Sequence, residues 1–119
     1  MKNYAYPHQE KLKQKKEISE LFERGKWKTS GNIRIVSFRK EENTGPKVGV
    51  SVSKRYFKKA VDRNRIKRLL RECYRLNREA FAAAFGDNSV SMIFWVSSEK
   101  PHHYNEVLKD FLNLCKPKK

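Results

Sequence analysis

Residues 47–77 read KVGVSVSKRYFKKAVDRNRIKRLLRECYRLN, and this stretch decides the fold. Valines alternate with glycine and serine over residues 47–53, which predicts a strand with one apolar face and one nearly bare face. The bare face leaves space for something to lie on the sheet. Over residues 60–77 apolar side chains recur at the helical period, which predicts a helix with one buried side. The members of this apolar side are Ile66, Leu69, Leu70 and Cys73.

Two further strands are predicted outside this stretch. Residues 32–40 alternate β-branched or aromatic residues with polar ones, which is typical of a half-covered strand, and residues 41–46 form a turn. Residues 90–97 form a continuous apolar run that indicates a strand buried on both faces, and Pro101 ends this segment. Together with residues 47–53, these segments supply three strands.

Helices are predicted near both ends and after the central one. Residues 16–26 form a short helix with one apolar stripe, and Gly25 is a stop that can adopt a positive φ. Residues 80–85 extend the central helix or form a second turn ended by Gly86, and residues 104–115 form an amphipathic closing helix. The order helix, strand, strand, helix, strand, helix predicts an α+β protein, in which helices pack on a small sheet.

The length of 119 residues predicts one domain with loose segments at its ends. Residues 1–10 contain Pro7 and show no clear period, so a flexible arm is expected there. Residues 116–119 place Pro117 between lysines and are expected to form a loose tail. The domain itself then covers residues 11–115.

Positive charge dominates the composition. Lys and Arg total 28 against 13 Asp and Glu, and the net charge of +15 indicates a polyanionic partner. A membrane surface is the competing polyanion, but the chain has no apolar run long enough for a bilayer and no signal-peptide core or lipidation motif. The expected location is therefore the cytoplasm. Cys73 and Cys115 have no metal-ligand spacing and are expected to be reduced core residues.

The basic residues gather most densely over residues 54–71, where Asp62 alone opposes them. The side of the predicted helix opposite its apolar side consists of Asn64, Arg68, Arg71 and Arg75, flanked by Arg65 and Lys67. Arginine can bind phosphate through two parallel hydrogen bonds or stack on an unpaired base, and asparagine can read a base edge or a sugar hydroxyl. This mixture favours structured RNA as the ligand. A solvated basic face without a ligand is the alternative.

The segment KVGVSVSKR, followed by KKAVDRNRIKRLLRECYR, is similar to the signature of the bacterial ribonuclease P protein family. Its Arg-Asn-Arg core corresponds to residues 63–65, and the resemblance covers roughly residues 11–115. It implies a small two-layer α/β sandwich, with a mixed sheet of about four strands and a left-handed βαβ crossover. It also implies a subunit of ribonuclease P that binds the catalytic RNA and the 5′ leader of precursor tRNA. This complex removes the leader endonucleolytically and forms the mature tRNA 5′ end.

The resemblance implies an RNA-facing set at the positions that match the family motif. These positions are Lys54, Arg55, Arg63, Asn64, Arg65, Lys67, Arg68 and Arg71. The charge and the helical projection of the same region add Lys58, Lys59 and Arg75. Among all of them, Arg65 and Arg68 are expected to contribute most.

The family binds the leader in a cleft between its first helix and the face of the sheet. The matching positions here are Ile18, Phe22 and Val36, with Phe38 beside them. Of the three matches Phe22 alone carries an aromatic ring, so stacking of the leader bases is expected to be weaker than with aromatic rings at all three positions. Plain core packing is the alternative for Phe22, Val36 and Phe38. Ser97 and Ser98 stand where relatives often carry an Arg before a Pro, so one cationic contact at the cleft mouth is expected to be missing.

No catalytic residues and no protein-bound metal are expected in this chain. Acid–base cleavage of RNA needs two titratable groups across a phosphodiester, whereas His8 lies in the expected arm and the side chains of His102 and His103 diverge. The acidic residues are expected to be solvated or locally paired rather than metal ligands. The resemblance implies that the RNA partner carries catalysis and holds the Mg²⁺, with one protein bound per RNA.

The residues alone leave three other functions open. A ribosomal or assembly protein would share the basic composition, and a stand-alone ribonuclease would need the acid–base groups just described. A DNA-binding regulator would place the basic helix in a major groove, but no helix-turn-helix spacing supports it. The ribonuclease P subunit is the preferred reading, with neither a membrane nor DNA as a partner.

Overall fold

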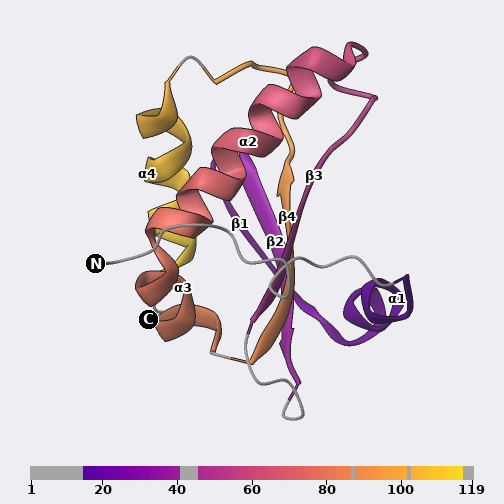
Figure 1. Cartoon of the computed structure of the whole chain (residues 1–119), viewed down its shortest axis with the longest axis vertical. Coiled ribbons are helices and arrows are strands. Elements are labelled where there is room, and N and C mark those ends of the chain that lie inside the picture. The colour runs from indigo at the N-terminus through magenta and orange to yellow at the C-terminus, as the bar shows by residue number, and fades with distance from the viewer. Residues whose placement is uncertain (1–14, 41–45, 87, 102, 117–119) are drawn as a thin grey trace.

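The computed structural model describes residues 15–40, 46–86, 88–101 and 103–116 (Figure 1). In chain order, its elements are α1 (Lys15–Arg24), β1 (Lys26–Ser30), β2 (Ile33–Arg39), β3 (Lys47–Val52), α2 (Ala60–Leu76), α3 (Arg78–Phe85), β4 (Ser89–Trp95) and α4 (Tyr104–Leu114). The predicted strands and helices are confirmed to within a few residues at each end. The expected arm, most of the predicted turn at 41–46 and most of the expected tail lie outside the described residues.

The strands form one mixed sheet in the order β1-β2-β4-β3. β1 pairs with β2, and β2 pairs with β4, in antiparallel fashion, whereas β3 and β4 are parallel. The parallel pair is joined through α2 and α3, because parallel neighbours need a crossover connection. The α+β class and the mixed sheet of four strands are therefore confirmed. The left-handedness of the crossover stays a prediction.

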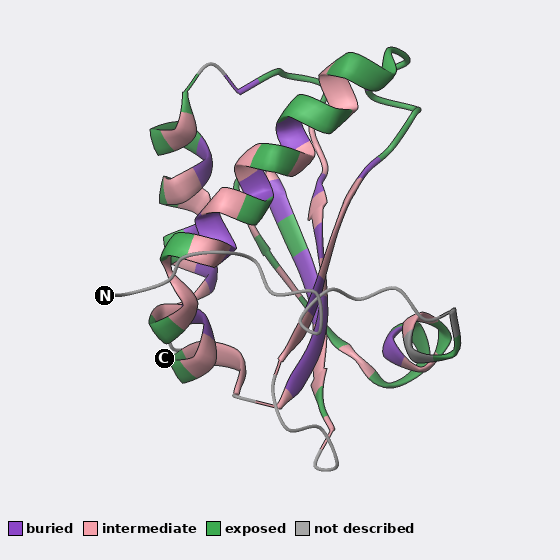
Figure 2. Ribbon diagram, viewed as in Figure 1, coloured by how far each residue is buried: buried purple, intermediate pink, exposed green. Residues whose placement is uncertain are grey.

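Helices cover the two faces of the sheet unequally (Figure 1). α2, α3 and α4 lie on one face, whereas α1 lies on the other. The main core is under α2 and α4, and Figure 2 shows buried residues on the strands there. Its strand residues, each at most 2% exposed, include Ile33, Ile35, Ile93 and Trp95. Burial of such a side chain contributes about 1.5–3 kcal/mol to stability.

β1 is the element that the sequence pattern did not predict. Its five residues, KWKTS, include one apolar side chain, Trp27, and the strand pairs with β2 at the edge of the sheet. Apolar alternation, the signal by which strands are predicted, is therefore absent. β1 is also tied to the end of α4, because Lys28 Nζ donates hydrogen bonds to the carbonyl oxygens of Leu114 and Lys116 at 2.7 and 2.8 Å. A cation is favourable at a helix C-terminus.

Gly25 follows α1, but not with the positive φ that the sequence suggested. Among the described residues, positive φ occurs at Gly31 and Gly86, with values of 54° and 98°. The Gly25 amide donates a hydrogen bond of 2.7 Å to the Leu21 carbonyl. A Cβ atom at Gly25 would come within 2.5 Å of Val36 Cγ2. α1 thus ends before Gly25 as predicted, but glycine is needed here for the close approach of α1 to β2 rather than for a positive φ.

Candidate functional site

α2 has one buried side and one exposed basic side, as predicted. Its buried side chains are Ile66, Leu70, Cys73 and Tyr74. Asn64, Arg68 and Arg71 are exposed, and Figure 2 shows exposed residues along the side of α2 that is turned away from the sheet. Neither Arg68 nor Arg71 forms an ion pair with a residue that the structure describes. Their guanidinium groups are therefore available to an outside ligand.

Three other arginines of the predicted RNA-facing set have intramolecular contacts. Arg63 Nη1 donates hydrogen bonds to the carbonyl oxygens of Phe57 and Lys58 at 2.9 and 2.8 Å, so it holds the loop before α2. Arg65 Nη1 donates to the Pro101 carbonyl at 2.7 Å. Arg75 pairs with Glu72 at 2.6 Å, and this carboxylate raises the pKa of the guanidinium.

These contacts divide the predicted set into two groups. Arg63 and Arg75 mainly support the protein itself, because both are half-buried and engaged within the chain. Arg65 links α2 to the segment before α4, yet the residue is exposed. The remaining members lie at the surface, and four of them precede α2 in the loop anchored by buried Phe57. We define the basic surface as Lys54, Arg55, Lys58, Lys59, Asn64, Arg65, Lys67, Arg68 and Arg71.

On the opposite face of the sheet, α1 is held by a small separate core. Leu21 of α1, Val36 of β2 and Val90 of β4 are fully buried together, and Ile18 and Phe38 are half-buried at its border. Val36 therefore cannot contact a ligand, and its prediction as a leader-cleft residue is wrong. The family resemblance placed Val36 between the first helix and the sheet, where it does lie, but α1 covers its side chain.

Three rings form an aromatic cluster beside this core. Phe22 of α1, Trp27 of β1 and Phe94 of β4 have ring centroids 5.7–6.2 Å apart, and the rings of Trp27 and Phe94 are stacked. Phe22 is 45% exposed and Trp27 is 41% exposed, so outside molecules can reach both rings. Arg34 lies over the Trp27 ring, with Cζ 4.4 Å from the ring centroid. We define Phe22, Trp27 and Phe94 as the aromatic cluster.

Sequence reasoning found Phe22 but missed the other two rings. Trp27 was missed because β1 was not predicted, and Phe94 because its strand was expected to be buried on both faces. A usable signal existed, since Trp27 comes two residues after Gly25 and begins a period-two pattern with Thr29. The expectation of a cleft with one ring is therefore corrected to a surface with three rings.

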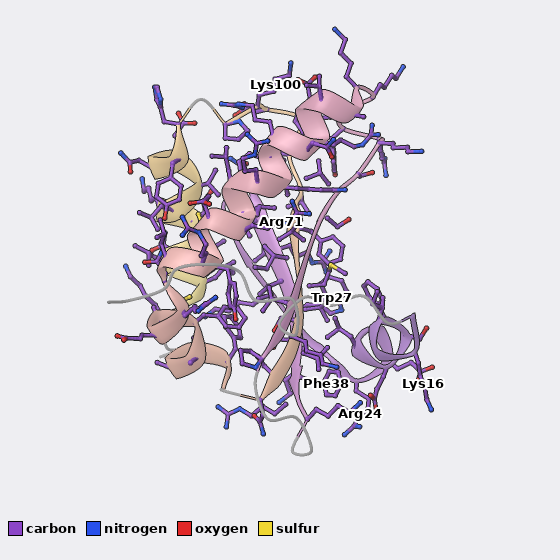
Figure 3. All side chains as sticks on the ribbon, in the orientation of Figure 1. Lys16, Arg24, Trp27, Phe38, Arg71 and Lys100 are labelled. Carbon is purple, nitrogen blue, oxygen red and sulfur yellow. The ribbon has the colours of Figure 1, made fainter. Side chains whose placement is uncertain are left out.

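The nearly bare face predicted for β3 lies on the same side of the sheet as these rings. Gly49 pairs with Met92, and Ser51 pairs with Phe94, in the parallel register of β3 and β4. Neither β3 residue carries a bulky side chain, so the sheet stays open beside the ring of Phe94. Phe38 lies farther along β2, and Arg24 Cζ is 5.2 Å from its ring centroid. Figure 3 shows Trp27 and Phe38 between the sheet and α1.

Acidic side chains in the described part of the chain form ion pairs with neighbouring cations. Glu20 binds Lys40 and Arg24 at 3.3 and 3.0 Å, and Lys40 is the main cause of its lowered pKa. Asp62 pairs with Lys100 at 3.2 Å. His8 and His102 lie outside the described residues, and His103 is exposed.

The thiols and acidic side chains do not suggest covalent or metal chemistry. Cys73 is fully buried, and burial raises the pKa of its thiol to about 12; burial also raises the pKa of Cys115 to about 11. Both are free thiols, and each is protonated at neutral pH. The described ranges contain no group of three or more His, Cys, Asp or Glu residues that could hold a metal ion. The described surfaces are therefore suited to binding, with cations on one face and rings on the other.

Comparisons with known proteins agree in one family. A family model described as Ribonuclease P matches residues 6–119. The ribonuclease P protein component of Proteus mirabilis is 32% identical over 108 residues, covering 91% of this chain and 88% of the relative. That of Chlorobaculum tepidum is 36% identical over 101 residues, covering 76% of this chain and 66% of the relative. The chain thus spans about two thirds of the length of some curated relatives.

Solved structures share the fold. The RNase P protein from Thermotoga maritima superposes with a TM-score of 0.75 at 21% identity, covering 89% of this chain and 94% of that one. The RNase P protein of Staphylococcus aureus gives a TM-score of 0.74 at 17% identity, covering 88% and 91%. Among the described residues, no helix is both long and apolar enough to cross a membrane.

Proposed function

Because the chain belongs to the ribonuclease P protein family, we propose that it is the RNA-binding protein subunit of a ribonuclease P ribonucleoprotein. In this proposal the complex acts in the cytoplasm as an endoribonuclease that removes the 5′ leader of precursor tRNA and leaves the mature 5′ end. The protein binds the catalytic RNA through the basic surface. It binds the leader through the aromatic cluster on the other face of the sheet.

The observation that carries the proposal is the one-sided basic surface. Burial of Ile66, Leu70 and Cys73 fixes the rotation of α2, so Arg68 and Arg71 must face outward. Their planar guanidinium groups suit bidentate contacts to phosphate. The exposed lysines of the preceding loop lie near the N-terminus of α2, which itself attracts anions. Together these groups favour a folded RNA with closely spaced phosphates over a single small anion.

The aromatic cluster supports the leader as the second ligand. Unpaired bases stack on aromatic rings without requiring a particular sequence, at about 1–3 kcal/mol per base. Phe22 and Trp27 offer exposed rings, and Arg34 adds a positive charge next to the second one. The bare β3 positions, Gly49 and Ser51, leave room for the sugar and phosphate of a strand that crosses the sheet. A single strand is a better fit than a duplex, whose bases are already stacked.

In the proposed division of labour, the RNA partner holds the Mg²⁺ and carries out phosphodiester hydrolysis. One protein binds one RNA, screens phosphate repulsion with its charge of +15 and positions the leader. This division accounts for a protein whose identified surfaces are basic and aromatic.

A reconstitution assay tests the proposal. The chain together with ribonuclease P RNA should cleave precursor tRNA at the leader junction in low Mg²⁺, and the chain alone should not. The double variant Arg68→Ala/Arg71→Ala should need more protein for the same rate. Lys109→Ala, which removes an exposed cation of α4 outside the basic surface, should behave like the unmodified chain. Failure of the chain to enhance cleavage by the RNA would rule the proposal out.

A further inference from the structure

A groove of about 720 Å³ lies where the sheet meets the ends of α3 and α4. Its size is within the range of small-molecule pockets, about 300–1,000 Å³. Residues 83–85, the last of α3, line it on one side, and Cys115 and Lys116, which follow α4, line it on another. Four of its other described residues come from β1 and β2. They are Lys26, Lys28, Ser37 and Arg39. We call this feature the edge groove.

The edge groove is on the side of the sheet that α2, α3 and α4 cover, so it is separate from the aromatic cluster. Successive side chains of a strand point to opposite faces. Ile35 of β2 belongs to the main core on the helix-covered side, so Ser37 and Arg39 are on that side as well. Lys26 pairs with Ser37 and shares its face, whereas the ring of Trp27 contacts α1 on the other face.

Small side chains leave the space that the edge groove occupies. On the helix-covered face of β2, large Ile35 is followed by Ser37, whose hydroxyl oxygen is 2.8 Å from that of Ser91 on β4. Across from these hydroxyls α3 ends in Ala83 and Ala84, which line the groove. The apolar packing of the main core therefore stops before the end of the sheet, and polar groups of the strands become accessible to a ligand.

Two cations of the edge groove have no partner within the described part of the chain. Lys28 Nζ already donates hydrogen bonds to two carbonyl oxygens at the end of α4. The side chains of Lys26 and Arg39 are exposed, and neither forms a hydrogen bond or an ion pair with a described residue. Because Lys26 pairs with Ser37, Arg39 is its diagonal neighbour on the same face, and such neighbours lie about 7–8 Å apart. One phosphate group can therefore contact both side chains.

The end of α3 adds hydrogen-bond acceptors beside these cations. The last carbonyl oxygens of a helix have no amide of their own helix to accept from. The Ala82 carbonyl accepts a hydrogen bond of 2.8 Å from the Gly86 amide, but those of residues 83–85 accept none from a described residue outside the helix. Arg39 lies against this end, since a Cβ atom at Gly86 would come within 2.8 Å of its Nε. The edge groove thus offers cations and carbonyl oxygens next to each other.

We propose that the edge groove is a nucleotide-binding site, separate from both surfaces of the proposed function. The phosphate contacts Lys26 and Arg39, and the base lies at the last turn of α3, where its N–H groups donate to the carbonyl oxygens of residues 83–85. Inorganic phosphate would use the cations alone, and a nucleoside would use the carbonyl oxygens alone. A nucleotide uses both. It is either a free nucleotide or an unpaired nucleotide of an RNA.

Titration of the full chain, without RNA, tests this site. Adenosine 5′-monophosphate should bind more tightly than adenosine or inorganic phosphate. Lys26→Ala and Arg39→Ala should each weaken binding of the nucleotide about three- to tenfold, which corresponds to the loss of one hydrogen bond to a charged group at the surface. Ala83→Leu fills part of the groove but keeps every cation, so it should weaken binding of the nucleotide and leave that of inorganic phosphate unchanged. Lys109→Ala is the matched control, and circular dichroism shows whether each variant is folded.

A titration of ribonuclease P RNA without tRNA separates the two sources of the nucleotide. Weaker RNA binding by Lys26→Ala and Arg39→Ala would assign the site to an unpaired nucleotide of the RNA, and unchanged RNA binding would assign it to a free nucleotide. Two results would overturn the inference. One is adenosine 5′-monophosphate binding no more tightly than inorganic phosphate, and the other is equal affinity of Lys26→Ala, Arg39→Ala and Lys109→Ala for the nucleotide. Because these nucleotide titrations contain no RNA, either result would leave the proposed function standing.

Discussion

Replacing Trp27 by alanine tests the aromatic cluster most directly. The indole is 41% exposed, it stacks on Phe94 and it lies under the guanidinium of Arg34. Its removal takes away the largest exposed stacking surface of the cluster. Loss of stacking with one base costs about 1–3 kcal/mol, which corresponds to roughly 5- to 150-fold weaker binding. Precursor tRNA should lose affinity by this factor, whereas tRNA without a leader should bind as before.

The measurement is a pair of titrations of the reconstituted complex, one with precursor tRNA and one with leaderless tRNA. Trp27→Phe keeps a ring and should recover most of the lost affinity. Leu112→Ala removes an exposed apolar side chain of α4 that lies outside the cluster and serves as the control. Circular dichroism shows whether each variant is folded. Equal losses on both RNAs, or no loss on either, would refute the assignment of the leader to these rings.

Intrinsic fluorescence gives an independent readout of the same contact. The chain has two tryptophans, of which Trp95 is 2% exposed in the main core. A single-stranded oligoribonucleotide that stacks on Trp27 should quench part of the emission of the free protein. The quenching should disappear in Trp27→Phe, because the buried Trp95 remains inaccessible. Persistent quenching in that variant would place the strand elsewhere.

Three more predictions follow from the structure. Arg65→Ala and Arg68→Ala should weaken binding to ribonuclease P RNA more than Lys109→Ala in a filter-binding titration, and equal losses of affinity in all three would contradict a special role for the basic surface. Arg65→Ala should also lower the melting temperature, because it loses the hydrogen bond to the Pro101 carbonyl. Gly25→Ala should lower the free energy of unfolding in urea by about 1–3 kcal/mol, because a Cβ atom there meets Val36 and the Leu21 carbonyl oxygen. An unchanged midpoint of urea unfolding would show that α1 can shift freely. Burial raises the pKa of the Cys73 thiol from 9.0 to about 12, so the folded protein keeps this proton up to a higher pH than the unfolded chain does. The free energy of unfolding should therefore fall as pH rises above 9.0. Cys73→Ala should flatten this part of the pH profile.

The periodic elements were predictable because burial leaves a repeating pattern in the sequence. α2 is the clearest example, since Ile66, Leu70 and Cys73 fix its orientation and place Arg68 and Arg71 outside. β1 was not predictable in this way, because an edge strand with one apolar side chain is specified by its partner β2 rather than by its own pattern. The periodicity of a single sequence does not show which distant segments pair with each other.

The two parts of the candidate site differ in the same way in how far the sequence predicts them. The basic surface is local in sequence, so charge and helical projection identified most of it. The aromatic cluster draws one ring each from α1, β1 and β4, and these rings meet after the sheet has formed. Val36 illustrates the opposite error, because its exposure depends on whether α1 covers that part of β2. Arg63 and Arg75 show that a cation in a basic run can serve the fold, which charge alone does not reveal.

β1 connects the two sides of the molecule within two successive residues. Trp27 lies on the side of α1, and Lys28, the next residue, holds the carbonyl oxygens at the end of α4 on the other side. Any ligand that steadies this strand by stacking on the indole therefore also steadies the lysine contact behind it. Amide protons in the last turn of α4 should then exchange with deuterium more slowly in the ligand-bound protein. Exchange at the C-terminal helix would thus detect a ligand that is bound on the other side of the sheet.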